Sequence, residues 1–299
     1  MPIKNPGKNL IPIASANIPA SIPAIINTAI LIATNIRLMF IVLSPCCIMN
    51  IKDFILMDNM PDTTDVSHWQ GTIDFALAKS HGLKGTIIKA TESTFYVDDR
   101  LLVNSKNAND AGLHIGYYHF LRANYDAKVQ ARFFYNTVKN LPLSYNYVCD
   151  TETFDGVSGA TVLSRVKTFC EEVTLLSGKE PWIYTSPGFW NSIGGYGSLG
   201  TWASRYKLWI AHYTSASTPI QPPPWKTFLF WQYTSKGIGP YYGTESLNVD
   251  LNRFNGSDAE YYSMFGGAIP TCSTVEEYLS NIDPFLRKLG YSGPRPPTS

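Results

Sequence analysis

Carboxylates stand at or near the ends of three strand-like segments in a chain of which only 16% is charged. Asp150 and Glu152 close the segment "YNYVCDTE", Asp65 lies in "TTDVS", and Asp250 lies in "NVDLNRF". Residues two apart on a strand face the same side, with Cα atoms roughly 6.6–6.8 Å apart. Repulsion between Asp150 and Glu152 would raise one pKa and keep that carboxyl protonated for use as a general acid. Such a pair suits the cleavage of a glycosidic bond.

Each acid also has a purely structural explanation. Asp65 could cap the turn that follows it, and Asp250 could pair with Arg253 near a strand end. Asp150 and Glu152 could be solvated loop acids, which is the commoner role of an isolated D-x-E. A metal site is the rival chemical interpretation, but the spacing of the neighbouring histidines does not match a zinc site; these are His68, His114, His119 and His212.

Composition narrows the class of protein. The 299 residues carry a net charge of +1, which gives no reason to expect a nucleic-acid partner. A hydrophobic content of 44% with a mean hydropathy of -0.08 is typical of a soluble globular chain, and aromatic residues reach 13%. The sequence contains no G-x-S-x-G, phosphate-binding glycine loop or dinucleotide fingerprint, so no cofactor is expected. Five irregularly spaced cysteines predict buried free thiols rather than a disulfide framework.

The order of the elements from residue 61 onward predicts an α/β fold. Strand-like runs "GTIIKAT", "HIGYYHF", "YNYVCDTE" and "PWIYTS" follow "TTDVS", and segments of helical spacing separate them. Three more strands, "KLWIAHY", "FLFWQYTS" and "NVDLNRF", follow without room for full crossover helices, since Pro222–Pro224 and a glycine-rich stretch interrupt the connections. Five βα units and three further strands close most simply as a distorted eight-stranded barrel, a single catalytic domain.

In such a barrel the functional residues lie at the carboxyl ends of the strands. Polar and aromatic residues occupy those positions here, and we expect them to contact a substrate. The predicted substrate-binding residues are Glu92, Tyr118, His119, Tyr184, Trp209, Tyr213 and Gln232. For Tyr118 and Trp209 a place in the core is an equally good interpretation, and His119 is better explained as a hydrogen-bonded rim residue than as a catalyst.

The chain resembles the glycoside hydrolase family 25 lysozymes of the Chalaropsis type, found among phage endolysins and bacterial autolysins. "DVSHWQG" and "GTIIKATESTFYVDD" look like the family's N-terminal signature. "GYYHF", "CDTE", "WIYTS", "LWIAHY", "WQYTS" and "VDLNRF" follow in the family's order, so the resemblance covers roughly Pro61 to Phe265. Ser93 departs from the pattern, because the family usually has glycine after this glutamate.

The resemblance implies a (β/α)5β3 barrel that hydrolyses the β-1,4 bond between N-acetylmuramic acid and N-acetylglucosamine in peptidoglycan, without a cofactor. Glu152 matches the proposed general acid. Asp150 matches the acid thought to assist the 2-acetamido group of the substrate or to stabilise the cationic transition state. Asp65 and Asp250 match the remaining acids of the cleft. We expect a monomer that acts on bacterial peptidoglycan, after secretion or after release by phage lysis.

The two ends of the chain differ from this barrel, which we assign to residues 61–266. Residues 1–60 are rich in Ile and Asn and lack any acid before Asp53. Ile25–Leu43 is a candidate membrane anchor, although a later start at Met49, Met57 or Met60 is an alternative that we favour slightly. The tail 267–299 has room for one short amphipathic helix at most and is too small for a wall-binding module.

Two other functions compete with a muramidase. One is a non-catalytic barrel that binds wall glycans and uses its acids only to hydrogen-bond sugar hydroxyls. The other is a metal-dependent deacetylase. The presence of both Asp150 and Glu152 favours the hydrolase over the binding protein.

Overall fold

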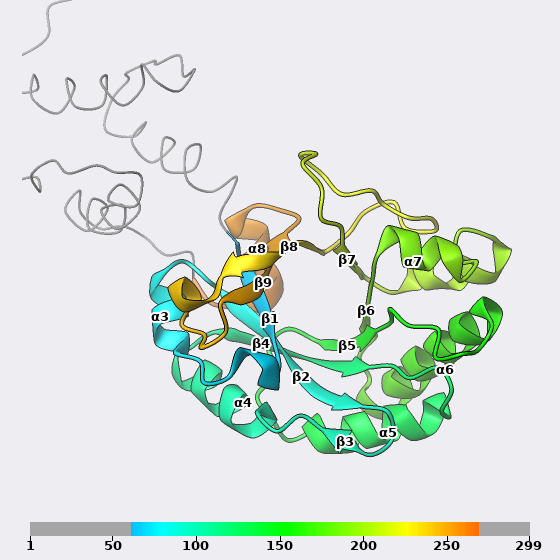
Figure 1. The fold of residues 1–299 in the computed structure, drawn as a ribbon, viewed down its shortest axis with the longest axis horizontal. Coiled ribbons are helices and arrows are strands. Elements are labelled where there is room, and N and C mark those ends of the chain that lie inside the picture. Colours follow the sequence, from blue (N-terminus) through cyan, green and yellow to red (C-terminus); the bar gives the residue numbers. More distant parts are fainter. Residues whose placement is uncertain (1–60, 269–299) are drawn as a thin grey trace, which may run out of the picture. The chain divides into compact units, whose positions relative to one another are not determined.

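Residues 61–268 are described by a computed structural model, and they form a closed barrel of eight strands (Figure 1). The sheet closes because β1 pairs with β2 on one side and with β9 on the other. All neighbouring strands are parallel except β9, which is antiparallel to both β8 and β1. Around the ring from β1, the strands are β1 (Thr63–Val66), β9 (Asn248–Phe254), β8 (Phe230–Ile238), β7 (Leu208–Ala211), β6 (Trp182–Thr185), β5 (Tyr147–Asp150), β4 (His114–Phe120) and β2 (Gly85–Glu92). The short β3 (Tyr96–Val97) pairs only with β2, outside the ring.

Five helices connect the first six barrel strands, as parallel pairing requires. They are α3 (Phe75–Ser80), α4 (Leu101–Asp110), α5 (Ala127–Val138), α6 (Gly159–Ser177) and α7 (Pro187–Ser192). Four of them begin at a side chain that accepts a backbone N–H of the first turn, namely Asp74, Asp126, Ser158 and Ser186. The predicted five βα units and three further strands are confirmed.

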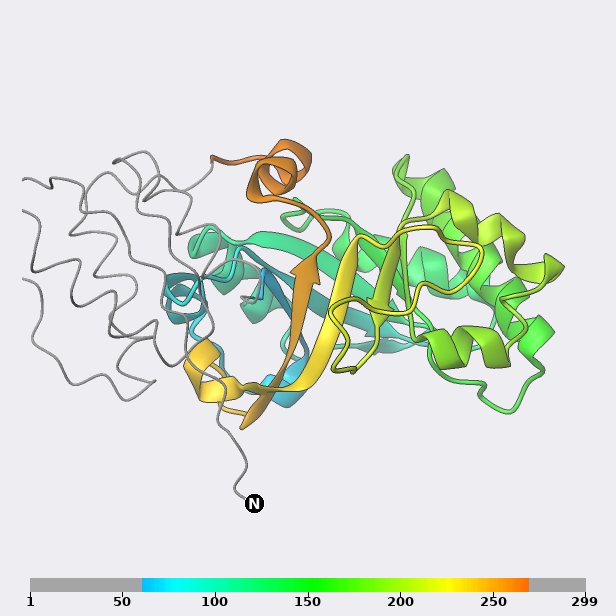
Figure 2. The same ribbon diagram turned by 90° about the horizontal axis from the view of Figure 1, so that it is seen from above.

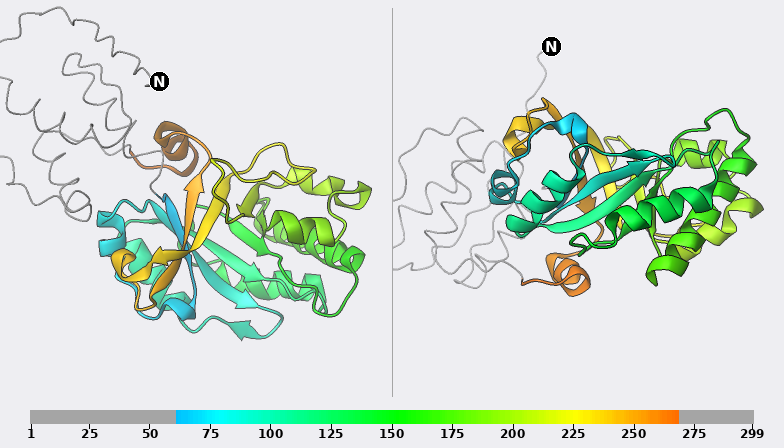
Figure 3. Two further views of the ribbon diagram at one scale, coloured as in Figure 1. Left: turned by 45° about the horizontal axis from the view of Figure 1, so that its top comes forward. Right: turned by 90° about the horizontal axis from the view of Figure 1, so that it is seen from below.

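The last three strands are joined by other means. β8 and β9 form a long antiparallel pair, which runs across the front of the view in Figure 2. Short 3-10 helices complete the connections: η1 (His68–Gln70), η2 (Ser198–Arg205) and η3 (Gly239–Tyr242). After β9 the chain adds α8 (Asp258–Phe265), which lies beside the barrel in Figure 3 and begins with a capping box between Ser257 and Glu260. The sequence pattern did not predict β3, α8 or the 3-10 helices, because each is too short to show a period.

Alternation along each strand divides the buried side chains into two sets. On β5, Val148 packs with the cluster inside the barrel, whereas Tyr147 and Cys149 pack with the cluster between the barrel and its helices. On β7, Trp209 is in the inner cluster and Ile210 in the outer one. The inner cluster is rich in large aromatic rings, which fill the barrel and leave its carboxyl end for polar side chains.

The predictions about cysteines, a membrane anchor and the chain ends can be compared with the structure only within residues 61–268. Cys149 and Cys170 are buried free thiols, as predicted. Within residues 61–268, no helix is long and apolar enough to cross a membrane. The proposed extension 1–60 with its candidate anchor, the tail beyond residue 268, and the three remaining cysteines (Cys46, Cys47 and Cys272) lie outside the described residues.

Ser93 directly follows β2 and has a left-handed backbone, with φ 57°. Its side chain is buried, and its hydroxyl has no hydrogen-bond partner within the described part of the chain. A non-glycine residue in this conformation costs about 1–2 kcal/mol. Glycine is therefore the residue that the local geometry favours at this turn.

We predict that Ser93→Gly raises the free energy of unfolding by about 1 kcal/mol, since the relief of strain exceeds the roughly 0.4–1 kcal/mol that glycine adds to the freedom of the unfolded chain. Thermal unfolding of the full chain should show a Tm about 2–4 °C higher. Ser93→Ala is the matched control, because it removes the hydroxyl and keeps the left-handed strain. A Ser93→Gly protein less stable than Ser93→Ala would show that the backbone at position 93 is not strained.

Candidate active site

The register of the barrel brings the predicted acids to one end. Asp65 on β1 lies directly opposite Asp250 on β9. Asp150 is the last residue of β5, and Glu152 follows two residues beyond the strand. Like charges directly opposite each other on neighbouring strands destabilise a sheet, so the site must hold these carboxylates against their repulsion.

Asp65 is held by two amide side chains. Nε2 of Gln232 donates to both carboxylate oxygens of Asp65, at 3.1 and 3.0 Å. Oε1 of Gln232 accepts the hydroxyl groups of Tyr184, at 2.9 Å, and Tyr213, at 2.7 Å. Because the two tyrosines occupy the oxygen of this amide, its N–H₂ group faces the carboxylate. Tyr184, Tyr213 and Gln232 therefore form one hydrogen-bonded group that orients Asp65.

Asn252 is the second donor to Asp65 and was missed in the sequence. It is fully buried, and its Nδ2 donates to Oδ1 of Asp65 at 2.8 Å. The indole N–H of Trp209 donates to Oδ1 of Asn252 at 2.6 Å and fixes the orientation of this amide. A signal was present, because Asn252 lies two residues after Asp250 and so shares its face of β9.

Trp209 was predicted to contact substrate, and the structure corrects this. Its side chain is buried in the inner cluster and only 2% exposed. Its ring packs against Tyr184, with centroids 4.4 Å apart. Trp209 therefore positions Asp65 through Asn252 and offers no surface to a sugar.

Asp150 and Glu152 differ in their surroundings. Asp150 is buried, and its Oδ1 has no hydrogen-bond partner among the described residues. Burial, followed by the charge of Glu152, raises the pKa of Asp150 well above its usual range. Glu152 is exposed at the rim, although the protein around it reduces its hydration and raises its pKa, against the opposing charges of Lys89 and Arg122. Asp150 is thus the deep acid of the pair and Glu152 the accessible one.

Asp65 and Asp250 extend the same electrostatic group. Burial raises the pKa of Asp65 to about 6, although its bonds from Asn252 and Gln232 oppose the shift. Burial and the charges of Asp65 and Glu152 raise the pKa of Asp250 to about 8. At neutral pH the group therefore keeps protons that isolated carboxylic acids would lose. No cluster of three or more His, Cys, Asp or Glu side chains within residues 61–268 is arranged to hold a metal ion.

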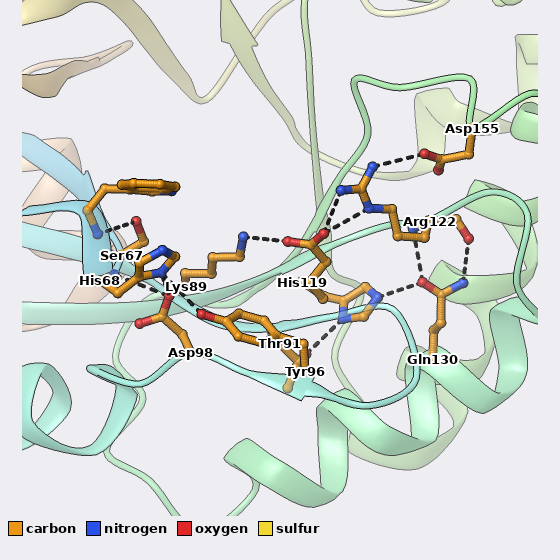
Figure 4. A network of polar contacts seen from close by, with 12 residues as sticks. Ser67, His68, Lys89, Thr91, Tyr96, Asp98, His119, Arg122, Gln130 and Asp155 are labelled. Carbon is orange, nitrogen blue, oxygen red and sulfur yellow. Dashed lines mark hydrogen bonds and ion pairs between the residues drawn. The ribbon is translucent and has the colours of Figure 1, made fainter.

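His119 does not face the substrate side, contrary to the sequence prediction. It is fully buried and stacks on Phe169 of α6, with ring centroids 4.9 Å apart. Its Nε2 donates to Oε1 of Gln130 at 3.0 Å, and its Nδ1 accepts the hydroxyl of Thr91 at 2.7 Å. Burial lowers the pKa of His119 to about 4. The preceding Tyr118 packs against the inner cluster, so alternation turns His119 out toward the helices. There it is a hydrogen-bonded core residue (Figure 4).

The remaining predicted residues lie near the acids but differ in accessibility. Glu92 binds Nζ of Lys89 at 2.7 Å and two nitrogens of Arg122 at 2.8 and 2.6 Å. Its burial opposes ionisation, but these bonds outweigh it and lower its pKa. Tyr118 lies within the electrostatic reach of Asp150 and Asp65, and its burial raises its pKa strongly. Tyr213 is 55% exposed, so its ring is open to a ligand.

Carboxylates at the carboxyl end of a (β/α)5β3 barrel, one deep and one accessible, are an arrangement that suits glycoside hydrolysis. Comparison with known proteins identifies the family of the chain. The sequence profile of glycosyl hydrolases family 25 matches residues 64–240. Lysozyme M1 of Streptomyces globisporus is 34% identical over 210 residues, covering 67% of this chain and 69% of that protein. The chain belongs to glycosyl hydrolase family 25.

Solved structures show the same fold. The crystal structure of a lysozyme from Streptomyces coelicolor matches with a TM-score of 0.60 and 30% identity, over 68% of this chain and 96% of that one. A muramidase from Trichobolus zukalii matches with a TM-score of 0.59 and 28% identity, over 69% and 99% of the two chains.

We predict that Asp250→Asn stabilises the protein at pH 8 and has little effect at pH 4. Because its folded-state pKa lies above the unfolded value, the native protein binds the extra proton, and stability falls as pH rises from about 4 toward 8. Removing the acid should raise the free energy of unfolding by about 1–3 kcal/mol at pH 8. Urea unfolding at both pH values measures the difference. Asp99→Asn, at an exposed acid outside the barrel strands, is the control. An Asp250→Asn protein that is destabilised at pH 8 would show that the charge of Asp250 does not weaken the fold.

Proposed function

We propose that this chain is a lysozyme, a 1,4-β-N-acetylmuramidase that cuts the bond between N-acetylmuramic acid and N-acetylglucosamine in bacterial peptidoglycan. The observation that carries the proposal is the pairing of Asp150 with Glu152, one buried at a strand end and the other accessible at the rim. Two carboxyls with different environments are what glycosidic cleavage needs, because one must donate a proton while the other faces positive charge. Membership of family 25 and the relatives named lysozyme and muramidase support the same activity.

Glu152 is our general acid, because it is the acid of the pair that a leaving-group oxygen can reach. In the free protein the stronger burial places the shared proton on Asp150. A bound glycan would reverse this order: it would cover Glu152 and disfavour its charge, while a positive anomeric or oxazolinium-like centre would favour the ionised form of Asp150. The proton is then on Glu152 when the bond breaks.

Asp65 and Asp250 act as supporting acids in this mechanism. The paired amides of Gln232 and Asn252 fix the Asp65 carboxylate, so it needs no reorganisation when positive charge develops nearby. Asp250 has the higher pKa of the two and can hold a proton at neutral pH, which reduces repulsion in the empty cleft. Tyr213 and Tyr118 are our candidates for direct contact with the sugar.

We further propose a monomer that acts at the bacterial cell wall, reached either by secretion or by release during phage lysis, without a cofactor or a nucleic-acid partner. Membrane attachment would depend on the N-terminal 60 residues. We assign the activity to residues 61–266, which contain every motif of the site.

Glu152→Gln should reduce lysis of purified bacterial cell walls by about 10²–10⁴-fold, because the amide keeps the shape but cannot deliver a proton. Loss of turbidity measures lysis, and mass spectrometry of the released fragments identifies the bond that is cut. A folded Glu152→Gln protein with full activity would refute the role of this residue. A wild-type protein that binds walls and cuts no glycosidic bond would favour the non-catalytic alternative.

Asp150→Asn is the companion variant and separates a coupled pair from two independent acids. Electrostatic coupling is reciprocal, so in the glycan complex, where Asp150 is the ionised partner, removing its charge should lower the pKa of Glu152. A general acid works only while protonated, so the basic limb of the pH–activity profile should move to lower pH. An unchanged basic limb would contradict the coupling.

The fragment 61–266, expressed alone, should be soluble and lytic. The barrel closes through the pairing of β1 with β9 inside this range, so its sheet needs no residue outside. Its specific activity on cell walls is compared with that of the full chain. If the fragment folds by circular dichroism yet loses the activity of the full chain, the flanking residues have an essential role.

A further inference from the structure

A cavity of about 550 Å³ opens beside the acids, and the mechanism above does not use it. Its walls come from η1, the end of β2, β3, the segment after β4 and the loop after β5. The volume lies in the range of small-molecule sites, which is roughly 300–1,000 Å³. The residues that matter most are Trp69, Phe95 and Tyr125 in its walls and Lys89, Glu92, Arg122 and Asp155 in its polar part.

None of the four acids lines the cavity, but residues in its walls lie near Glu152. Asp155, one of its lining residues, lies three positions after Glu152 in the loop that follows β5. Lys89 and Arg122 also line the cavity, and both are near enough to Glu152 to act on its charge. A glycan strand bound across the acids would therefore place in the cavity sugar units that lie beyond the bond being cut.

The polar part of the cavity is neutral as a whole. Lys89 pairs with Glu92 at 2.7 Å, and Arg122 pairs with Glu92 at 2.6 Å and with Asp155 at 2.9 Å (Figure 4). Two cations are thus balanced by two carboxylates. A charged ligand would gain little net attraction here, whereas the hydroxyl and acetamido groups of a neutral sugar would find both donors and acceptors.

Large aromatic rings stand exposed around this polar part. Trp69 is 75% exposed and Phe95 70% exposed. Trp69 sits on a rigid base: Ser67 accepts its backbone N–H at 3.2 Å, and its ring lies 4.6 Å from that of His68. His68 is in turn held by Asp98 at 2.7 Å. An exposed indole on a fixed base presents an apolar face and a polar edge, which suits stacking against a sugar ring.

We infer that this cavity is an accessory subsite for a neutral N-acetylhexosamine unit of the glycan strand, and that Trp69 is its stacking platform. The inference rests on the proposed function, because the strand reaches the cavity from the acids. It selects the sugar over the peptide stem of peptidoglycan, since the stem carries free carboxylates and the paired charges leave no unbalanced cation to bind them.

The test uses the full chain and glycan strands of alternating N-acetylglucosamine and N-acetylmuramic acid, separated by length and prepared both without and with their peptide stems. Trp69→Ala should raise KM about 5- to 20-fold for strands long enough to fill the cavity, with kcat unchanged, and should leave the shortest cleavable strand unaffected. Trp69→Phe should recover most of the loss. Tyr196→Ala is the matched control: this aromatic residue is 39% exposed and lies outside the cavity, so its kinetics should equal the wild type at every length.

The failures of the two proposals can be told apart. If the wild type cuts strands and Trp69→Ala matches it at every length, or loses activity equally at every length, the subsite is refuted and the hydrolase stands. A defect confined to peptide-bearing strands would assign the cavity to the stem and also refute it. If the wild type cuts nothing, calorimetric titration with a long strand still decides: weaker binding by Trp69→Ala supports the subsite, and equal binding overturns it.

Discussion

Repulsion among four carboxyl groups at one end of a barrel is the constraint on which the rest of this structure depends. Asp65 and Asp250 face each other across neighbouring strands, and Asp150 is buried with no partner among residues 61–268 for one of its oxygens. Such groups persist only where the surrounding fold over-determines their positions. The closed sheet does this, because each acid is part of or adjoins a strand whose register is fixed by neighbours on both sides.

Hydrogen bonds relieve only part of this repulsion, and they do so unevenly. Asp65 receives donors from two buried amides, and its pKa is raised less than that of Asp250, for which burial and like charges act together. Lys89 and Arg122 supply positive charge near Glu152 but are themselves bound to other carboxylates. The result is a graded set of acids with one accessible member. A mechanism that needs a protonated acid beside a carboxylate that stabilises positive charge can use these differences in pKa and exposure.

Alternation along the strands directs the acids into the barrel and directs other side chains outward, where they pack against the helices. On β5 the inward residues are Val148 and Asp150, and Cys149 between them packs against the helices. On β4, Tyr118 turns inward and His119 outward. Moving either strand by one residue would exchange the two sets and place thiol or imidazole where an acid or phenol now lies. The outer hydrogen bonds of His119 therefore help to keep the face that carries the acids in register.

The sequence by itself determined the strands, most of the crossover helices, and the acids at the strand ends. These follow from patterns within a few residues: the period of apolar side chains, the caps, and the position of Asp150 after a run of strand formers. Only the tertiary structure decided which residues support the acids. Gln232 meets Asp65 across 167 positions, and Asn252 meets it across 187. The same holds for Trp209, which bonds Asn252 and not a sugar, and for the cavity beside Trp69, whose walls come from five segments. The period of apolar residues predicts which face of its strand a side chain occupies. Which distant residue that side chain then contacts depends on how the barrel closes, and no local pattern predicts this.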